Sequence, residues 1–191
     1  MSKVLGAVLA GGRSSRFGTD KALAQWEGRS LLDHAVTLLE GVCARVVVCG
    51  RPSEDERMIA DRPEAGLGPL GGLNAALHLA RELGLASVVS IGCDTPIIPA
   101  TVLNTLVRSQ RPLILESQPI IGSWPASLAE ALDRFLAEHP TRSVRAWAET
   151  CGAEMFSFEG IPNVNYADDL EALNFQDIPA SECPKGSGDP V

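Results

Sequence analysis

The sequence predicts an α/β fold, a three-layer α/β/α sandwich around a mostly parallel sheet. Short apolar runs alternate with helix-like segments for most of the 191 residues. This alternation is typical of parallel sheets with helices on both faces. Two of the apolar runs, residues 4–9 and 87–91, are followed by glycine-containing segments. Ligands of such sheets bind at the carboxyl ends of the strands, so these two segments mark the candidate site.

The first half of the chain predicts three buried strands and two helices. Val46, Val47 and Val48 form a β-branched run that fits a central parallel strand. Ser30, with Asp33 three residues later, resembles a capping box at the start of a helix. The predicted elements are strands at 4–9, 45–49 and 87–91 and helices at 30–39 and 71–83.

The second half of the chain is less regular, and its elements are shorter. We expect helices at 100–109, 126–138, 143–150 and 168–173 and strands at 113–115, 120–121 and 153–158. Residues 179–191 are rich in Pro, Gly and Ser, which predicts a disordered tail. The chain is short for two well-filled domains, so we expect one domain over residues 1–178.

The overall composition is that of an ordinary globular protein, with 45% hydrophobic and 21% charged residues. The net charge of −8 argues against a nucleic-acid binder, because such proteins usually present basic surfaces. Five cysteines without a CxxC pair argue against a disulfide framework or metal cluster and favour a reducing cytoplasm. No apolar run approaches the roughly 20 residues that span a bilayer, so we expect no membrane segment.

The segment between residues 9 and 21 has the composition of a phosphate-binding loop. Gly11 and Gly12 follow a buried strand and allow backbone N–H groups to approach a ligand closely. Three cations follow them: Arg13, Arg16 and Lys21. These groups suit a triphosphate, although the segment matches neither a Walker A loop nor GxGxxG. A surface turn with solvated arginines is the alternative, but three cations so close together favour the anion site.

A carboxylate follows the strand that ends at Ile91. Asp94 lies in Cys93-Asp94-Thr95-Pro96, at the expected carboxyl end of that strand. Mg²⁺ prefers one or two carboxylates together with phosphate oxygens, so Asp94 is a candidate ligand for Mg²⁺, with Mn²⁺ as a substitute. The plainer role of such an aspartate is to cap the following turn. The glycine-rich loop elsewhere in the chain favours the metal site.

Other polar and glycine-rich segments fit either a ligand site or a plain surface. Residues 66–72 contain four glycines, whose backbone could touch a flat ring, but composition alone favours a flexible loop. Asp61 could accept from ring or ribose donors or could be a solvated acid. Arg142 and Arg145, on either side of Ser143, suit a bound phosphate or a solvated helix face. The tryptophans are expected to pack rather than to form a stacking platform.

Seven segments occur in a recognisable order. They are Leu9-Ala-Gly-Gly12, Arg16-Phe-Gly-Thr-Asp-Lys21, Gly68-Pro-Leu-Gly-Gly72, Cys93-Asp-Thr-Pro96, Gly122-Ser-Trp-Pro-Ala-Ser-Leu128, Arg142-Ser-Val-Arg-Ala-Trp147 and Asn163-Val-Asn165. Together they resemble the molybdenum cofactor guanylyltransferases, a family of the nucleotidyltransferase superfamily with a Rossmann-like, glycosyltransferase-A-like (nucleotide-diphospho-sugar transferase) fold. The resemblance runs from about Val4 to Leu173 and is more specific than any single segment.

The resemblance implies transfer of GMP from GTP to molybdopterin, with release of pyrophosphate. The expected nucleotide-binding residues are Leu9, Ala10, Gly11, Gly12, Arg13, Lys21, Asp61, Gly68, Pro69, Leu70 and Asp94. The expected catalytic residues are Arg16, Lys21 and Asp94, and Asp94 would also bind Mg²⁺. The candidate pterin-binding residues are Trp124, Arg142, Ser143, Arg145, Asn163 and Asn165. Molybdoenzymes or their chaperones, and a GTP-binding adaptor protein, are the candidate protein partners.

The nucleotide and the acceptor are less strongly specified than the reaction class. Cytidylyl-transferring relatives typically carry Leu-Ala-Ala-Gly in the first loop, so Gly11 after Ala10 favours GTP. The chain departs from the family at Cys49, where asparagine is common, and at Gln118-Pro119, where His-Pro is common. The alternatives are a CTP-using molybdopterin cytidylyltransferase, a sugar-phosphate nucleotidyltransferase, and a non-enzymatic carrier of molybdopterin and GTP.

Overall fold

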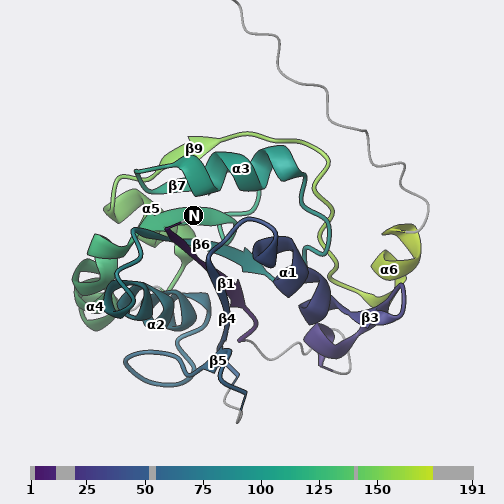
Figure 1. Cartoon of the computed structure of the whole chain (residues 1–191), viewed down its shortest axis with the longest axis horizontal. Helices are drawn as coiled ribbons and strands as arrows, with labels where there is room; N and C mark the ends of the chain where they lie inside the picture. Colours follow the sequence, from purple (N-terminus) through teal and green to yellow (C-terminus); the bar gives the residue numbers. More distant parts are fainter. Residues whose placement is uncertain (1–2, 12–19, 52–54, 140–141, 174–191) are drawn as a thin grey trace, which may run out of the picture.

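The computed structural model describes residues 3–11, 20–51, 55–139 and 142–173. The strands of its central sheet are β1 (Val4–Leu9), β4 (Arg45–Cys49), β5 (Met58–Ile59), β6 (Ser87–Gly92), β7 (Leu113–Leu115), β8 (Gly122–Pro125) and β9 (Glu154–Phe156). They lie in the order β5-β4-β1-β6-β8-β7-β9 (Figure 1). A separate antiparallel ribbon pairs β2 (Gln25–Trp26) with β3 (Arg29–Ser30).

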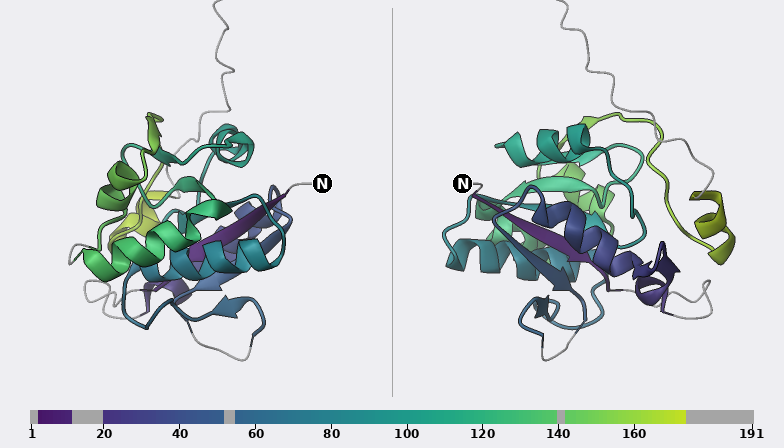
Figure 2. Two further views of the ribbon diagram at one scale, coloured as in Figure 1. Left: turned by 90° about the vertical axis from the view of Figure 1, so that its left-hand side faces the viewer. Right: turned by 45° about the vertical axis from the view of Figure 1, so that its right-hand side comes forward.

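Helices cover both faces of the sheet, which gives the three predicted layers (Figures 1 and 2). The helices are α1 (Leu31–Glu40), α2 (Pro69–Glu82), α3 (Ala100–Arg108), α4 (Ala129–Glu138), α5 (Val144–Thr150) and α6 (Ala167–Leu173), with 3-10 turns η1 (Lys21–Leu23) and η2 (Ala126–Leu128). The core on one face of the sheet contains residues of α2, α4 and α5, and the core on the other contains residues of α1 and α3.

The pleat of β1 explains how one strand serves both cores. Leu5 and Ala7 face the core under α2, whereas Val4 and Val8 face the core under α1, because successive side chains point to opposite faces. Gly6 lets α1 approach closely: a Cβ at this residue would lie 3.0 Å from Leu39 Cβ. Every residue of β1 is buried, as expected for a central parallel strand.

The strand register places the candidate site at one edge of the sheet. In the parallel ladders, Leu9 pairs with Cys49 on one side and with Gly92 on the other. Cys49 in turn pairs with Ile59 at the end of β5. The segments that follow all four strands therefore leave the sheet at the same edge, and those after β1, β5 and β6 contain residues singled out by sequence. β8 alone in this sheet runs antiparallel to its neighbours.

Two helix starts follow from local chemistry. Ser30 Oγ accepts from Asp33 N at 3.0 Å, and Asp33 Oδ2 accepts from Ser30 N at 3.2 Å, so the predicted capping box is confirmed. α2 begins at Pro69, two residues before the predicted start. Proline suits this first helical position, because its fixed φ is helical and it has no N–H that needs a partner.

Several predicted elements were wrong or missed. The strand expected at 120–121 is a turn, in which Ile121 N donates to Gln118 O at 2.9 Å, and the strand begins at Gly122. Ile121 is apolar because it packs in the core. The strand expected at 153–158 is confined to 154–156. β2, β3 and β5, each of two residues, are too short to leave a periodic signal.

The predicted tail at 179–191 lies outside the described residues. Within them, no helix combines the length and the apolar character that crossing a bilayer requires.

Candidate functional site

Three segments that are distant in sequence bring Lys21, Asp94 and Asn165 together. Lys21 Nζ lies 3.4 Å from Asp94 Oδ2 and 3.4 Å from Asn165 Oδ1. The Lys21 side chain is 12% exposed and that of Asp94 is 29% exposed, so the pair borders solvent without projecting into it. Two residues predicted to handle phosphate are thus neighbours, and one residue predicted for the pterin joins them.

The turn after β6 presents the carboxylate of Asp94 to the site. Gly92 leaves it room, since a Cβ on Gly92 would overlap Asp94 Oδ1. The Asp94 carbonyl oxygen accepts from Val164 N at 2.8 Å, which ties the turn to the 161–165 segment. In the part of the chain that the structure describes, no backbone N–H donates to the Asp94 carboxylate. The alternative role as a turn cap is therefore not seen.

Arg51, which the sequence reasoning missed, links the two ends of the glycine-rich segment. Its guanidinium forms an ion pair with Asp20, and its Nε donates to the Ala10 carbonyl oxygen at 3.4 Å. The hydrogen bond from Arg51 holds the pKa of Asp20 below its usual value, although burial opposes the shift. Asp20 also caps η1 by accepting from Ala22 N at 3.2 Å. The sequence signal that could have identified Arg51 is a cation just after a predicted strand, at the edge of the sheet where ligands bind.

Gly11 and Gly50 pack backbone against backbone at the ends of β1 and β4. A Cβ on Gly50 would lie 2.8 Å from Gly11 N and 3.3 Å from Asp61 Oδ1. The φ of Gly50 is 81°, in the left-handed region that favours glycine. Gly11 therefore lies beside the segment that contains Asp61.

The two carboxylate oxygens of Asp61 have different surroundings. Among the described residues, no group donates a hydrogen bond to Asp61 Oδ1, whereas Oδ2 accepts from Gly66 N at 3.3 Å. Burial raises the pKa of Asp61 above its usual value, because the charged form loses hydration. Oδ1 itself is closed to solvent, so it does not offer a ligand an open acceptor. Asp61 is half-buried and not a fully solvated acid, and its role as a ligand acceptor stays a prediction.

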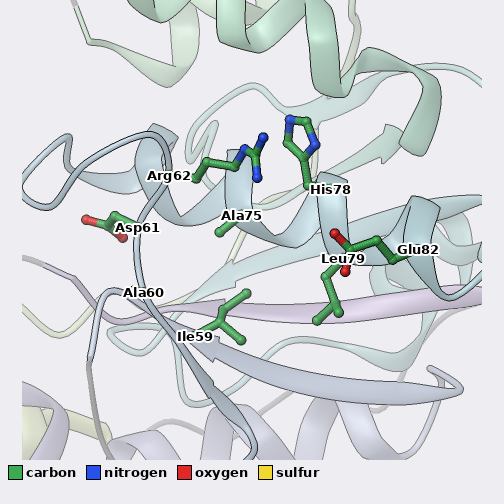
Figure 3. Close-up of a pocket in the computed structure, with 8 residues that line it drawn as sticks. All are labelled: Ile59, Ala60, Asp61, Arg62, Ala75, His78, Leu79 and Glu82. Atoms are coloured by element: carbon green, nitrogen blue, oxygen red, sulfur yellow. The ribbon is translucent and has the colours of Figure 1, made fainter.

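A side-chain network holds the segment next to Asp61. Asp133 on α4 accepts from Asn74 Nδ2 at 2.7 Å and lies 2.9 Å from His78 Nε2. Asn74 Nδ2 also donates to the Arg62 carbonyl oxygen at 3.4 Å. Arg62 and His78 border a cavity of about 280 Å³ between this segment and α2 (Figure 3). In Figure 3 the Asp61 carboxylate points away from the Arg62 and His78 side chains, so His78 and its partners lie on the other side of this segment from that carboxylate.

The first turn of α2 contains the glycines expected to form a loop. A Cβ on Gly72 would lie 2.7 Å from Cys49 Cβ, and one on Gly71 would lie 3.0 Å from Asp61 Cβ. These glycines let the helix pack tightly on β4 and on Asp61. The expectation of a flexible loop is therefore wrong for the second half of 66–72, where Pro69 and Leu70 are helical.

Burial limits how some predicted nucleotide-binding residues could act. The side chains of Leu9, Ala10 and Leu70 are buried in the cores, so any ligand contact would have to come from their backbones. Ala10 N already donates to Cys49 O at 3.1 Å. Gly68, with φ of 65°, lies at the N-terminal cap of α2 and is partly exposed. Gly12, Arg13 and Arg16 lie outside the described residues.

Trp124 is a correction to the predicted pterin site. Its side chain is fully buried, and its Nε1 donates to Ser90 Oγ at 2.9 Å. The ring fills the core between the sheet and the helices, where it cannot face a ligand. A motif that resembles a binding segment thus contains a packing residue.

The remaining pterin candidates divide into two groups. Ser143 is the N-cap of α5 and accepts from Ala146 N at 3.4 Å. Arg145 Nη2 donates to the Glu116 carbonyl oxygen at 2.7 Å, so both residues have roles within the fold. All five candidates are exposed, and Arg142, Asn163 and Asn165 form the second group. Of these, Asn165 contacts Lys21.

The site suits an anionic ligand better than a protein-held metal cluster. No group of three or more His, Cys, Asp or Glu among the described residues could hold a metal ion. A cation would depend on Asp94 and on oxygens of the ligand itself. Lys21 can receive a phosphate, and Asp61 can accept from donors on a base or sugar. Such parts, at the carboxyl edge of a three-layer α/β fold, are those that a nucleotidyltransferase needs to hold a nucleoside triphosphate.

Comparison with known proteins identifies the family. The model of the MobA-like NTP transferase domain matches residues 6–153. The chain belongs to this family and, within it, to the molybdenum cofactor guanylyltransferases.

Individual relatives agree in sequence and in fold. The molybdenum cofactor guanylyltransferase of Rhizobium leguminosarum bv. trifolii is 37% identical over 154 residues, covering 75% of this chain and 74% of the relative. The enzyme of that name from Acidiphilium cryptum is 30% identical over 186 residues, covering 90% and 94%. The structure of molybdopterin-guanine dinucleotide biosynthesis protein A from Archaeoglobus fulgidus has a TM-score of 0.71 at 20% identity, covering 88% of this chain and 95% of that one. The last comparison supports the predicted nucleotide-diphospho-sugar transferase fold.

Proposed function

We propose that this chain transfers GMP from GTP to molybdopterin and releases pyrophosphate. The observation that carries the proposal is the pairing of Lys21 with Asp94, at 3.4 Å, on the edge of the sheet where Asp61 also lies. Triphosphate and base would then lie along one edge, with the phosphates at Lys21 and the base or ribose at Asp61. Family membership supports the same reaction.

The residues present fit a Mg²⁺ ion, or Mn²⁺ in its place. Asp94 offers a partly exposed carboxylate with no backbone cap in the described residues. Mg²⁺ commonly takes only one or two protein carboxylates and completes its shell with phosphate oxygens and water. A bound ion would supply charge neutralisation on the phosphate oxygens.

The protein's own contribution is to position the reactants and stabilise charge. An oxygen of the molybdopterin phosphate attacks the α-phosphorus of GTP, and the bond from that phosphorus to pyrophosphate breaks. Lys21 would stabilise the negative charge that grows on the leaving group, helped by the predicted Arg16. Asn165 accepts from Lys21 Nζ and so fixes the ammonium group. Holding the phosphates in line supplies much of the rate enhancement.

Pyrophosphate release tests this function. It would be measured with GTP, CTP and ATP in turn, with Mg²⁺ and with or without molybdopterin. We expect release only with GTP and molybdopterin together, and a loss of about two to three decades in Asp94→Asn. Asp168→Asn, an exposed aspartate on α6, is the matched control.

Each alternative gives a different result in the same assay. Faster release with CTP than with GTP would make the protein a cytidylyltransferase. Release that needs a sugar phosphate instead of molybdopterin would make it a sugar-phosphate nucleotidyltransferase. Binding of molybdopterin and GTP without release of pyrophosphate would leave a carrier.

The setting of the reaction is part of the proposal. We place it in the cytoplasm, because five cysteines without a CxxC pair suit a reducing compartment. Molybdoenzymes or their chaperones, and a GTP-binding adaptor protein, are the proposed protein partners. Copurification with the chain in the presence and absence of molybdopterin would test these partners.

A further inference from the structure

Gln118 joins two segments of the candidate site through its side-chain amide. It lies in the loop between β7 and β8. Its Nε2 donates to the Ile161 carbonyl oxygen at 3.1 Å, and its Oε1 accepts from Thr95 Oγ1 at 3.0 Å. Thr95 follows Asp94 and is fully buried, and Ile161 begins the segment that leads to Asn165.

Chemistry fixes which end of the amide faces which partner. The Ile161 carbonyl can only accept, so the NH₂ group must face it and the amide oxygen must face Thr95. The Gln118 backbone is also held, because its N donates to Leu115 O at 3.2 Å and its O accepts from Ile121 N at 2.9 Å. The side chain therefore extends from a fixed turn to two defined partners.

The Thr95 hydroxyl has one proton and two acceptors within reach. Gln118 Oε1 is 3.0 Å away, and Asp94 Oδ1 is 3.5 Å away, at the outer limit of a hydrogen bond. The closer acceptor takes the proton. Gln118 thus takes the hydroxyl proton and leaves Asp94 Oδ1 without that donor, while Asp94 Oδ2 accepts from Lys21.

The same amide also closes a ring of hydrogen bonds around the site. Val164 N donates to Asp94 O at 2.8 Å, and the buried Val164 side chain packs with Leu31 of α1. The ring therefore runs from Gln118 through Thr95 and Asp94 to Val164, and back through Ile161. It sets the distance between Asp94 and Asn165, the residue after Val164. Both Asp94 and Asn165 contact Lys21.

We propose that Gln118 is a positioning residue for nucleotidyl transfer, an inference that rests on the proposed function. It does not touch the reactants. It fixes Asp94 and Asn165 on either side of Lys21 and orients the Thr95 hydroxyl. Because the nucleotide base would bind elsewhere, near Asp61, loss of Gln118 should slow transfer with little change in the KM for GTP.

The first test replaces the amide with an unbranched side chain of similar length. In Gln118→Met we expect kcat to fall about 10- to 100-fold, with the KM for GTP within about threefold of wild type. Hydrogen exchange of the Val164 amide should rise by about tenfold or more, since its acceptor turn is no longer held. Gln110→Met, at an exposed glutamine beyond α3, is the matched control. It should change neither kcat nor the hydrogen exchange of the Val164 amide.

The second test restores the hydrogen bonds with a different group. A neutral imidazole has one donor nitrogen and one acceptor nitrogen, as the amide does. At about pH 8, where an unperturbed imidazole is neutral, Gln118→His should recover kcat to within about fivefold of wild type. Failure to recover would assign the Met defect to packing and overturn the proposal.

The outcomes separate this inference from the function on which it rests. If wild type releases pyrophosphate normally and Gln118→Met does too, or if its Val164 exchange is unchanged, the positioning role is wrong and the function stands. If wild type releases no pyrophosphate with GTP and molybdopterin, the proposed function itself fails.

Discussion

Gly92 and Asp94 share a space that only one side chain can occupy. A Cβ built on Gly92 would overlap Asp94 Oδ1 and would lie 3.3 Å from Asp94 Cγ. The backbone at Gly92 is not in the left-handed region, so glycine is needed there for room and not for conformation. The missing side chain lets the carboxylate lie over the end of β6, within reach of Lys21.

Gly92→Ala should therefore damage the site more than the fold. The new methyl group would push the Asp94 carboxylate away, and we expect pyrophosphate release to fall about 10- to 100-fold. Gly41→Ala, at the end of α1, is the matched control: its Cβ would have its nearest contact at an ordinary 3.6 Å. Equal activity in both variants would show that Asp94 does not need its present position.

Lys21→Met tests whether the ammonium acts on the reaction or only supports the fold. Its two contacts are long, at 3.4 Å, and both partners reach solvent, so their contribution to stability should be small. We expect kcat to fall by about two to three decades, with a change in unfolding free energy of about 1 kcal/mol or less. Lys3→Met, an exposed lysine just before β1, is the control. A variant that lost activity only through unfolding would contradict the catalytic role.

Local patterns were enough to predict the layers and the edge that carries the site. Buried runs gave β1 and β4, and the capping box at Ser30 gave the start of α1. The position of Asp94 followed from the strand before it, because parallel strands leave a sheet at a common edge. These are features whose physical cause lies within a few neighbouring residues.

The side-chain partners in the site could not be predicted in the same way. Asn165 meets Lys21 across 144 residues, and Gln118 meets Ile161 across 43, so no local period records either contact. Ile121 shows the converse problem, since an apolar residue buried in a turn has the same sequence signal as one in a strand. Trp124 was ambiguous because a motif does not say which of its side chains face inward.

Asp61→Asn should weaken GTP binding more than transfer. The Asp61 carboxylate is half-buried, and a donor on the nucleotide would form a charge-assisted hydrogen bond with it that the amide weakens. We expect the KM for GTP to rise about tenfold with kcat nearly unchanged. An unchanged KM would remove Asp61 from the nucleotide site.

The pH dependence of GTP affinity gives a second measurement on the same residue. Burial raises the pKa of Asp61, so its carboxylate is protonated at a higher pH than an ordinary aspartate, for which the value is about 3.9. The protonated form is a poorer acceptor. GTP affinity of wild type should therefore decline as the pH falls through this raised pKa, whereas Asp61→Asn should lack that component. Parallel pH profiles for the two proteins would contradict the assignment.

Asp133→Ala should destabilise the protein by about 1–3 kcal/mol, because it leaves the fully buried Asn74 amide without its closest acceptor. Urea unfolding measures the change, and Asp168→Ala is the exposed control. Burial opposes ionisation of Asp133, but hydrogen bonds from Asn74 and His78, with Arg62 nearby, hold its pKa below the usual value.

The lowered pKa of Asp133 also predicts the direction of the pH effect. A carboxyl group whose pKa is lower in the folded state contributes stability above its unfolded pKa, and that contribution is lost as the pH falls through the folded value. The difference in unfolding free energy between wild type and Asp133→Ala should thus be present at about pH 5 and shrink below about pH 4. A difference that grew on acidification would mean that the neutral acid makes the stabilising contacts. Because Asn74 also holds the Arg62 carbonyl, the KM for GTP should rise in this variant even where it is fully folded.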